Sequence, residues 1–185
     1  LAWWSGTSIS DGNVTLRDTT IAATTAHCVQ LRSPISSTPI TISDSTLTST
    51  ISAVWVVDTL TASPLVIQRS EVTSDDGSRH VIELVAALTN SPVTIVDSKV
   101  RSTPLAGAGN AIHFEAASTD SAVTVAKSVV AAGNIGVHFA TDPMMRCPVT
   151  VESSTVTGAV GWVTSPAVGA DIGKFIVRTT RFRKP

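Results

Sequence analysis

The residues best suited to acid–base chemistry lie close together in the sequence. Asp75-Asp76-Gly77 reads as an acidic turn, and Glu83 follows shortly after it. Hydrolysis of a glycosidic bond needs two carboxyl groups that flank the bond about 5 to 9.5 Å apart, one of them kept protonated. Asp75, Asp76, Glu83 and His113 are therefore the candidate catalytic residues of a polysaccharide hydrolase or lyase.

A second set of chemically capable side chains recurs once in each of seven short apolar segments. It combines aromatic, amide, carboxyl and imidazole groups: Trp3, Gln30, Trp55, Glu83, His113, His138 and Trp162. Tryptophan stacks on the C–H faces of sugars while the polar members bond hydroxyl groups, so such a set is typical of an oligosaccharide platform. The same side chains also anchor interfaces between protein chains. A ligand face, an interface and a merely exposed column all stay open.

Metal and cofactor sites are not indicated. His113 and His138 have only Glu83 near them as a further ligand, which falls short of a zinc site. Gly107-Ala108-Gly109 lacks the following helix and the third glycine of a dinucleotide-binding loop. We expect no metal and no cofactor.

The elements that position these residues are specified by a repeat. An eight-residue pattern, VTLRDTTI, starts at Val14 and returns at spacings of 26, 25, 28, 30, 26 and 26 residues. Its copies begin at Val14, Ile40, Leu65, Val93, Val123, Val149 and Phe175. Self-similarity at this period indicates a solenoid.

The columns of the repeat predict a strand that turns a corner. The first, third and eighth positions are apolar in every copy, and the sixth is always Ser or Thr. Because the inward-facing phase shifts by one residue between the third and eighth positions, the strand must bend between them. We expect the hydroxyl at the bend to bond backbone groups that the bend leaves unpaired.

A second strand follows each bend, in segments such as Val54–Val56 and Ile112–Phe114. Two or three short strands per turn, with no helical period, predict an all-β parallel β-helix of about seven coils. We expect one domain over 1–185, with an incomplete entry coil over 1–13, seven repeats over 14–182 and a tail over 183–185. Longer connections at 73–79 and 101–110 are expected on one face, often the binding face in solenoids.

This coil pattern resembles the right-handed pectin-lyase-like superfamily, and most of all a segment of a bacteriophage tailspike or fibre, or of a bacterial surface adhesin. The resemblance implies a right-handed coil and, for tailspikes, a homotrimer. Polygalacturonases of this fold carry NTD, DD, GHG and RIK motifs, of which only the DD pair, Asp75-Asp76, is present. The calcium cluster of pectate lyases has no equivalent, since Asp18, Asp44 and Asp97 occupy the bend, where a turn role is expected.

The charge and composition of the chain restrict the kinds of partner that it is expected to bind. Charged residues make up 15% of the chain and the formal net charge is −1, which disfavours nucleic acid and anionic membranes as partners. No apolar run is long enough for membrane insertion, and the start at Leu1 suggests a processed or excised chain. Cys28 and Cys147 lie several coils apart, too far for a disulfide, and are expected to be buried free thiols.

From these observations we expect a non-enzymatic structural or attachment module that is extracellular or exposed on a cell surface or virion. It would bind a surface glycan or self-assemble, with a homo-oligomer, a trimer in particular, or the flanking β-helix of a longer chain as partner. The alternatives are a polysaccharide lyase or glycoside hydrolase and a monomeric carbohydrate-binding module.

Overall fold

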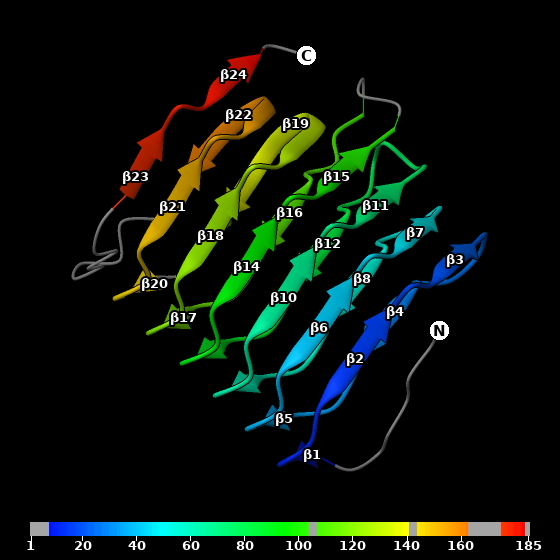
Figure 1. The fold of residues 1–185 in the computed structure, drawn as a ribbon, viewed down its shortest axis with the longest axis vertical. Helices are drawn as coiled ribbons and strands as arrows, with labels where there is room; N and C mark the ends of the chain where they lie inside the picture. The colour runs from blue at the N-terminus through cyan, green and yellow to red at the C-terminus, as the bar shows by residue number, and fades with distance from the viewer. Residues whose placement is uncertain (1–7, 104–106, 141–143, 163–174, 184–185) are drawn as a thin grey trace.

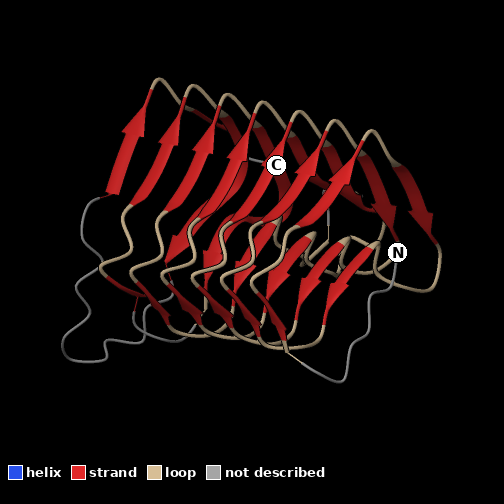
Figure 2. Cartoon of the chain, turned by 60° about the horizontal axis from the view of Figure 1, so that its bottom comes forward, coloured by secondary structure: helices blue, strands red, loops and turns tan. Residues whose placement is uncertain are grey.

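The chain is a parallel β-solenoid of about six turns with no helix among the described residues. The computed structural model describes residues 8–103, 107–140, 144–162 and 175–183. Figure 1 shows the strands stacked side by side along the axis, and Figure 2 shows the separate rows into which they fall. Every strand pair is parallel, and partner residues lie about one repeat apart, as in Val14↔Ile40. The predicted fold class is confirmed.

The first sheet contains the first strand of each repeat. Its seven strands are β2 (Val14–Arg17), β6 (Ile40–Ser43), β10 (Leu65–Gln68), β14 (Val93–Val96), β18 (Val123–Ala126), β21 (Val149–Glu152) and β23 (Phe175–Arg178).

The second and largest sheet has two rows of strands. The row after the bend contains β3 (Thr20–Ala23), β7 (Thr46–Ser49), β11 (Glu71–Ser74), β15 (Lys99–Ser102) and β24 (Arg181–Arg183). The other row contains the second strands, β4 (Val29–Leu31), β8 (Val54–Val56), β12 (Ile82–Leu84) and β16 (Ile112–Phe114). Two long strands, β19 (Val129–Phe139) and β22 (Thr155–Trp162), join the rows.

The structure contains a third sheet of two-residue strands that the sequence pattern did not predict. Its members are β1 (Ile9–Ser10), β5 (Ile35–Ser36), β9 (Leu60–Thr61), β13 (Leu88–Thr89), β17 (Ser118–Thr119) and β20 (Met144–Met145). These strands are too short for an alternating apolar pattern to stand out, although Ile35, Leu60 and Leu88 are each at most 1% exposed.

The core is formed by inward columns in which each apolar side chain stacks on its equivalent one coil away. Ile40, Leu65, Val93 and Val123 form one such column, and each is at most 1% exposed. Burying one of these side chains contributes roughly 1.5 to 3 kcal/mol before conformational entropy is subtracted. The apolar columns predicted for the repeat therefore form the core, except in the last copy, where Val177 and Phe182 are 40% and 50% exposed.

The bend after each first strand is made by a residue with left-handed backbone followed by a buried hydroxyl. The left-handed residues have φ between 47° and 53° and include Asp44, Arg69 and Lys127. A non-glycine residue there costs roughly 1–2 kcal/mol, so the bend must be stabilised by other contacts.

Those contacts come from a ladder of hydroxyls that runs along the axis. Each ladder serine donates to the carbonyl two residues before it, as Ser98 Oγ does to Val96 O at 2.7 Å. Each also accepts the backbone N–H of the ladder residue one coil before, over distances of 3.1 to 3.2 Å. The ladder members are Thr19, Ser45, Ser70, Ser98, Ser128 and Ser154. The predicted role of the bend hydroxyl is confirmed.

A second ladder with the same geometry precedes each first strand. Its members are Thr38, Ser63, Ser91, Ser121 and Cys147, each following a residue with φ between 49° and 52°. At four of the five positions a proline comes next, which needs no N–H partner. The proline carbonyl instead accepts the N–H of the first-strand residue one coil before, as Pro64 does from Ile40 at 2.8 Å.

The two cysteines are buried thiols that are not joined in a disulfide, as predicted. Cys147 takes the place of a ladder hydroxyl, accepting from Ser121 N at 3.3 Å and donating to Met145 O at 3.2 Å. Burial raises the pKa of both thiols, so neither is activated as a nucleophile.

In the part of the chain that the structure describes, no helix is long and apolar enough to cross a membrane.

Replacing Ser98 with alanine tests the first ladder. The substitution leaves the buried N–H of Ser70 without its acceptor, so the free energy of unfolding should fall by about 1–3 kcal/mol in urea titrations. Ser10→Ala, at an exposed position on β1, is the matched control and should change it by less than about 0.5 kcal/mol. Equal effects of the two substitutions would contradict a stabilising ladder.

Candidate functional site

Five of the seven residues predicted to share one column do so. Gln30 pairs in register with Trp55, Trp55 with Glu83, Glu83 with His113, and His113 with His138. Four of them occupy the middle position of β4, β8, β12 and β16, and His138 the matching position of β19, so their side chains point away from the inward columns.

The other two members differ. Trp3 lies outside the described residues. Trp162 was predicted beside His138, but Gly161 pairs with His138 while Trp162 pairs with Phe139. Two register irregularities between β19 and β22 shift the alignment by one residue, so the placement of Trp162 in the column is wrong.

Trp55 is the centre of a small groove. His27 stacks on it with ring centroids 4.3 Å apart and an interplanar angle of 24°. The guanidinium carbon of Arg32 lies 5.8 Å from the centre of the Trp55 ring, within reach of a cation–π contact. The groove has a volume of about 240 Å³ and is lined by Trp55, His27, Ile51, Ser52, Arg79 and Glu83.

The polar groups of this groove are held in place by hydrogen bonds. Ser52 Oγ donates to Glu83 Oε2 at 2.5 Å, which orients the half-buried carboxylate. His27 Nδ1 lies 2.7 Å from the carbonyl oxygen of Ser52. Because a carbonyl only accepts, Nδ1 must carry the hydrogen, and the neutral ring keeps Nε2 as an acceptor. Burial lowers the pKa of His27, which favours this neutral form.

Three histidines form a stack farther along the same face. His80 stacks on His113 with centroids 4.0 Å apart, and His113 on His138 with centroids 4.9 Å apart. The Nδ1 atoms of His113 and His138 are 2.8 Å apart. Asn110 contacts all three rings, through its backbone N–H to His80 Nδ1 and through Nδ2 to the other two.

Sequence reasoning placed His113 and His138 but missed Asn110 and the stacking role of His80. Both lie two residues before a second strand, His80 before Ile82 and Asn110 before Ile112. Gly109-Asn110 is an ordinary turn signal in the sequence, and Gly133-Asn134 repeats it. Asn134 in fact donates to Asn110 Oδ1 at 3.2 Å and so fixes the Asn110 amide with Nδ2 toward the rings.

The four catalytic candidates are held by different partners. Asp76 accepts from the N–H and hydroxyl of Ser78, which lowers its pKa, the opposite of what a general acid requires. Asp75 is exposed and accepts from Thr103 Oγ1 at 3.0 Å.

Glu83 and His113 share the second-strand column, but both side chains are already held by contacts within the protein. Glu83 is bonded to Ser52, and His113 is only 8% exposed among the stacked rings, where burial lowers its pKa to about 4. These contacts do not form the pair of opposed carboxyl groups that glycoside hydrolysis uses.

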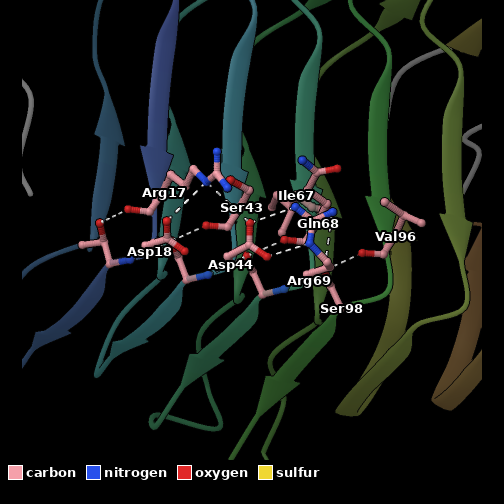
Figure 3. Close-up of polar contacts among 12 residues, drawn as sticks. Arg17, Asp18, Ser43, Asp44, Ile67, Gln68, Arg69, Val96 and Ser98 are labelled. Carbon is pink, nitrogen blue, oxygen red and sulfur yellow. Dashed lines mark hydrogen bonds and ion pairs between the residues drawn. The ribbon is translucent and has the colours of Figure 1, made fainter.

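The acidic residues at the bend have the turn role that their spacing suggested. Asp18, Asp44 and Asp97 all have left-handed backbone. Figure 3 shows Asp44 beside Arg69 of the next coil, joined by two hydrogen bonds of 2.6 and 2.8 Å. The hydrogen bonds from Arg69 lower the pKa of Asp44. An open groove of about 490 Å³ follows this row, and its lining mixes carboxylates with Arg69 and Lys99.

Among the described residues, no group of three His, Cys, Asp or Glu side chains is arranged to hold a metal ion.

The two longer connections pack directly on each other beside the column. Gly109 N donates to Gly77 O at 2.7 Å. A Cβ atom on Gly109 would overlap the carbonyl oxygen of Arg79, and one on Gly107 would overlap that of Gly77. The glycines of the GAG segment therefore serve close backbone packing of two insertions.

In comparisons with known proteins, no family model and no curated protein matches the chain.

Gly109→Ala tests the packing of the two connections. The added methyl group must displace backbone, so we expect the free energy of unfolding to drop by about 1–3 kcal/mol in urea titrations. Gly12→Ala is the matched control, because its added Cβ meets nothing closer than 3.9 Å. A Gly109→Ala protein as stable as Gly12→Ala would show that the two connections are not closely packed.

Proposed function

We propose that this β-solenoid is a non-enzymatic attachment module that binds a glycan through the groove at Trp55. The observation that carries the proposal is the groove itself, where a partly exposed indole ring stands beside a carboxylate and an imidazole held by hydrogen bonds. An apolar ring for the sugar face and fixed polar groups for its hydroxyls are the two parts of a carbohydrate site.

The size and chemistry of the groove favour one sugar ring. Its volume of about 240 Å³ lies below the ~300 Å³ at which sites for drug-sized ligands begin. Glu83 accepts hydroxyl hydrogens, His27 Nε2 offers a further acceptor, and Arg79 supplies donors. A longer glycan would extend along the column toward Gln30.

The resemblance to tailspikes and surface adhesins supports an extracellular, cell-surface or virion location and self-assembly into a trimer. A fold alone does not establish a function, so the proposal depends mainly on the groove at Trp55. A depolymerase is the less favoured alternative, because Asp76 is held ionised in a turn and Glu83 is bonded to Ser52.

Glycan-array screening followed by calorimetric titration of the best ligand tests the proposal. Trp55→Ala should weaken binding at least about tenfold, since loss of an aromatic anchor costs about 2 kcal/mol or more. Thr94→Ala is the control. Thr94 is half-buried on β14, in a different sheet, and binding should be unchanged.

Three outcomes would contradict the glycan proposal. One is the absence of binding across the array. Another is a solution mass that falls from oligomer to monomer in Trp55→Ala, which would make the column an interface between copies of the chain. The third is release of new reducing ends or unsaturated sugars by the unmodified chain, abolished by Asp76→Ala, which would identify a depolymerase.

A further inference from the structure

The histidine stack holds together the two connections that pack beside the column. His80 belongs to the segment 75–81 before β12, and Asn110 to the segment 107–111 before β16. His138 lies in β19, one coil farther on. Asn110 contacts rings from all three coils and is itself 3% exposed. It is therefore the point through which the connections are fastened to the second-strand row.

The bond from Asn110 to His80 exists only while His80 is neutral. The backbone N–H of Asn110 donates to His80 Nδ1 at 3.1 Å, so Nδ1 must offer a lone pair. A protonated imidazole carries hydrogen on both nitrogens. Protonation of His80 would therefore break this bond and leave a buried N–H without an acceptor.

The contact between His113 and His138 also requires that at least one of the two rings is neutral. Their Nδ1 atoms are 2.8 Å apart, and Asn110 Nδ2 lies 3.2 and 3.1 Å from them. Either one Nδ1 donates a hydrogen to the other, or both accept from the two hydrogens of the Asn110 amide, and in each case at least one ring must be neutral. If both rings were cationic, two N–H groups would point at each other, so the contact cannot survive a second charge.

The charged groups around the three histidines do not cancel the lowering of their pKa values by burial. Burial is the largest effect on the pKa of His80 and lowers it, while Glu83 and Glu115 raise it and Arg79 and His138 lower it. For His113 burial comes first, and the charges of His80 and His138 lower the pKa further, to about 4. Burial also lowers the pKa of His138.

We propose that Asn110 and the stacked rings of His80, His113 and His138 form an acid-released clasp, which fastens the segments 75–81 and 107–111 to the solenoid when neutral and frees them when protonated. The clasp acts beside Glu83 and Arg79, which line the Trp55 groove. Its operation does not depend on what that groove binds.

The direction of the pH dependence follows from linkage. Opening of the segments removes His80 and Asn110 from His113 and exposes the rings to water, where imidazole has an ordinary pKa of 6.5, whereas the closed clasp holds the pKa of His113 near 4. Between these values the open form binds more protons, so closure is fully favoured above about pH 6.5 and is lost as the pH falls toward about 4. The opening equilibrium should rise between about tenfold and a hundredfold from about pH 7 to about pH 4.5.

Amide hydrogen exchange of the whole chain, followed by NMR at about pH 7 and about pH 4.5, tests the clasp. The protection factor of the Asn110 amide should fall at least about tenfold on acidification, while that of Val100, in the core of β15, stays within about threefold. His27→Asn, which leaves the stack intact, should respond like the unmodified chain. An Asn110 protection factor that does not change with pH would overturn the proposal.

The variant His80→Asn/His113→Asn/His138→Asn removes every titrating ring of the clasp, and its Asn110 amide should show no more acid response than Val100. A response of the original size would also overturn the proposal. If this variant does not fold, titration of the imidazole resonances in the unmodified chain decides. The proposal requires His113 to titrate near pH 4 with His80 and His138 below 6.5, and an ordinary value for His113 would refute it.

Discussion

The fold depends on one repeated backbone device, a left-handed residue followed by a buried hydroxyl. It occurs at two bends of each coil, and at both the hydroxyl accepts an N–H from the preceding coil. Each bend therefore combines a strained backbone conformation with a hydrogen bond between coils that compensates for the strain. Because each hydroxyl serves its neighbour, the bends must stack in register, and the apolar columns then stack as well.

In the described residues, the connection between the row after the bend and the second strands has no such ladder, and this explains where the candidate site lies. Between the row after the bend and the second strands, the connecting segments differ in length from coil to coil. The longer ones carry Gly77, His80, Gly109 and Asn110, which pack and bond to each other. The two ladders fix the geometry of the rest of the coil. Side chains and connection lengths therefore vary most on the face that carries Trp55 and the histidine stack.

Much of this architecture could be predicted from the sequence because the repeat is visible in its columns. The apolar positions, the bend and the hydroxyl at Ser98 and its equivalents all follow from side-chain type and spacing. The second ladder also had a signal, a Ser, Thr or Cys two residues before five of the seven first strands, from the copy at Ile40 to the copy at Val149. The site was harder to predict, since β19 shifts the register at Trp162 and the clasp joins connections of unequal length. Asn110 and His80 do share a column, two residues before their second strands, but a His and an Asn do not form a repeated pattern.

The most direct test of this account is the exchange of the ladder amides themselves, measured by NMR across a urea series. The N–H groups of Ser45, Ser70 and Ser98 in one ladder and of Ser63 and Ser91 in the other bond a buried hydroxyl in the next coil. The account predicts that all five exchange only through global unfolding, with the urea dependence of the whole chain. Exchange as fast as that of the exposed Ser10, independent of urea, would show that the ladders do not hold the coils together.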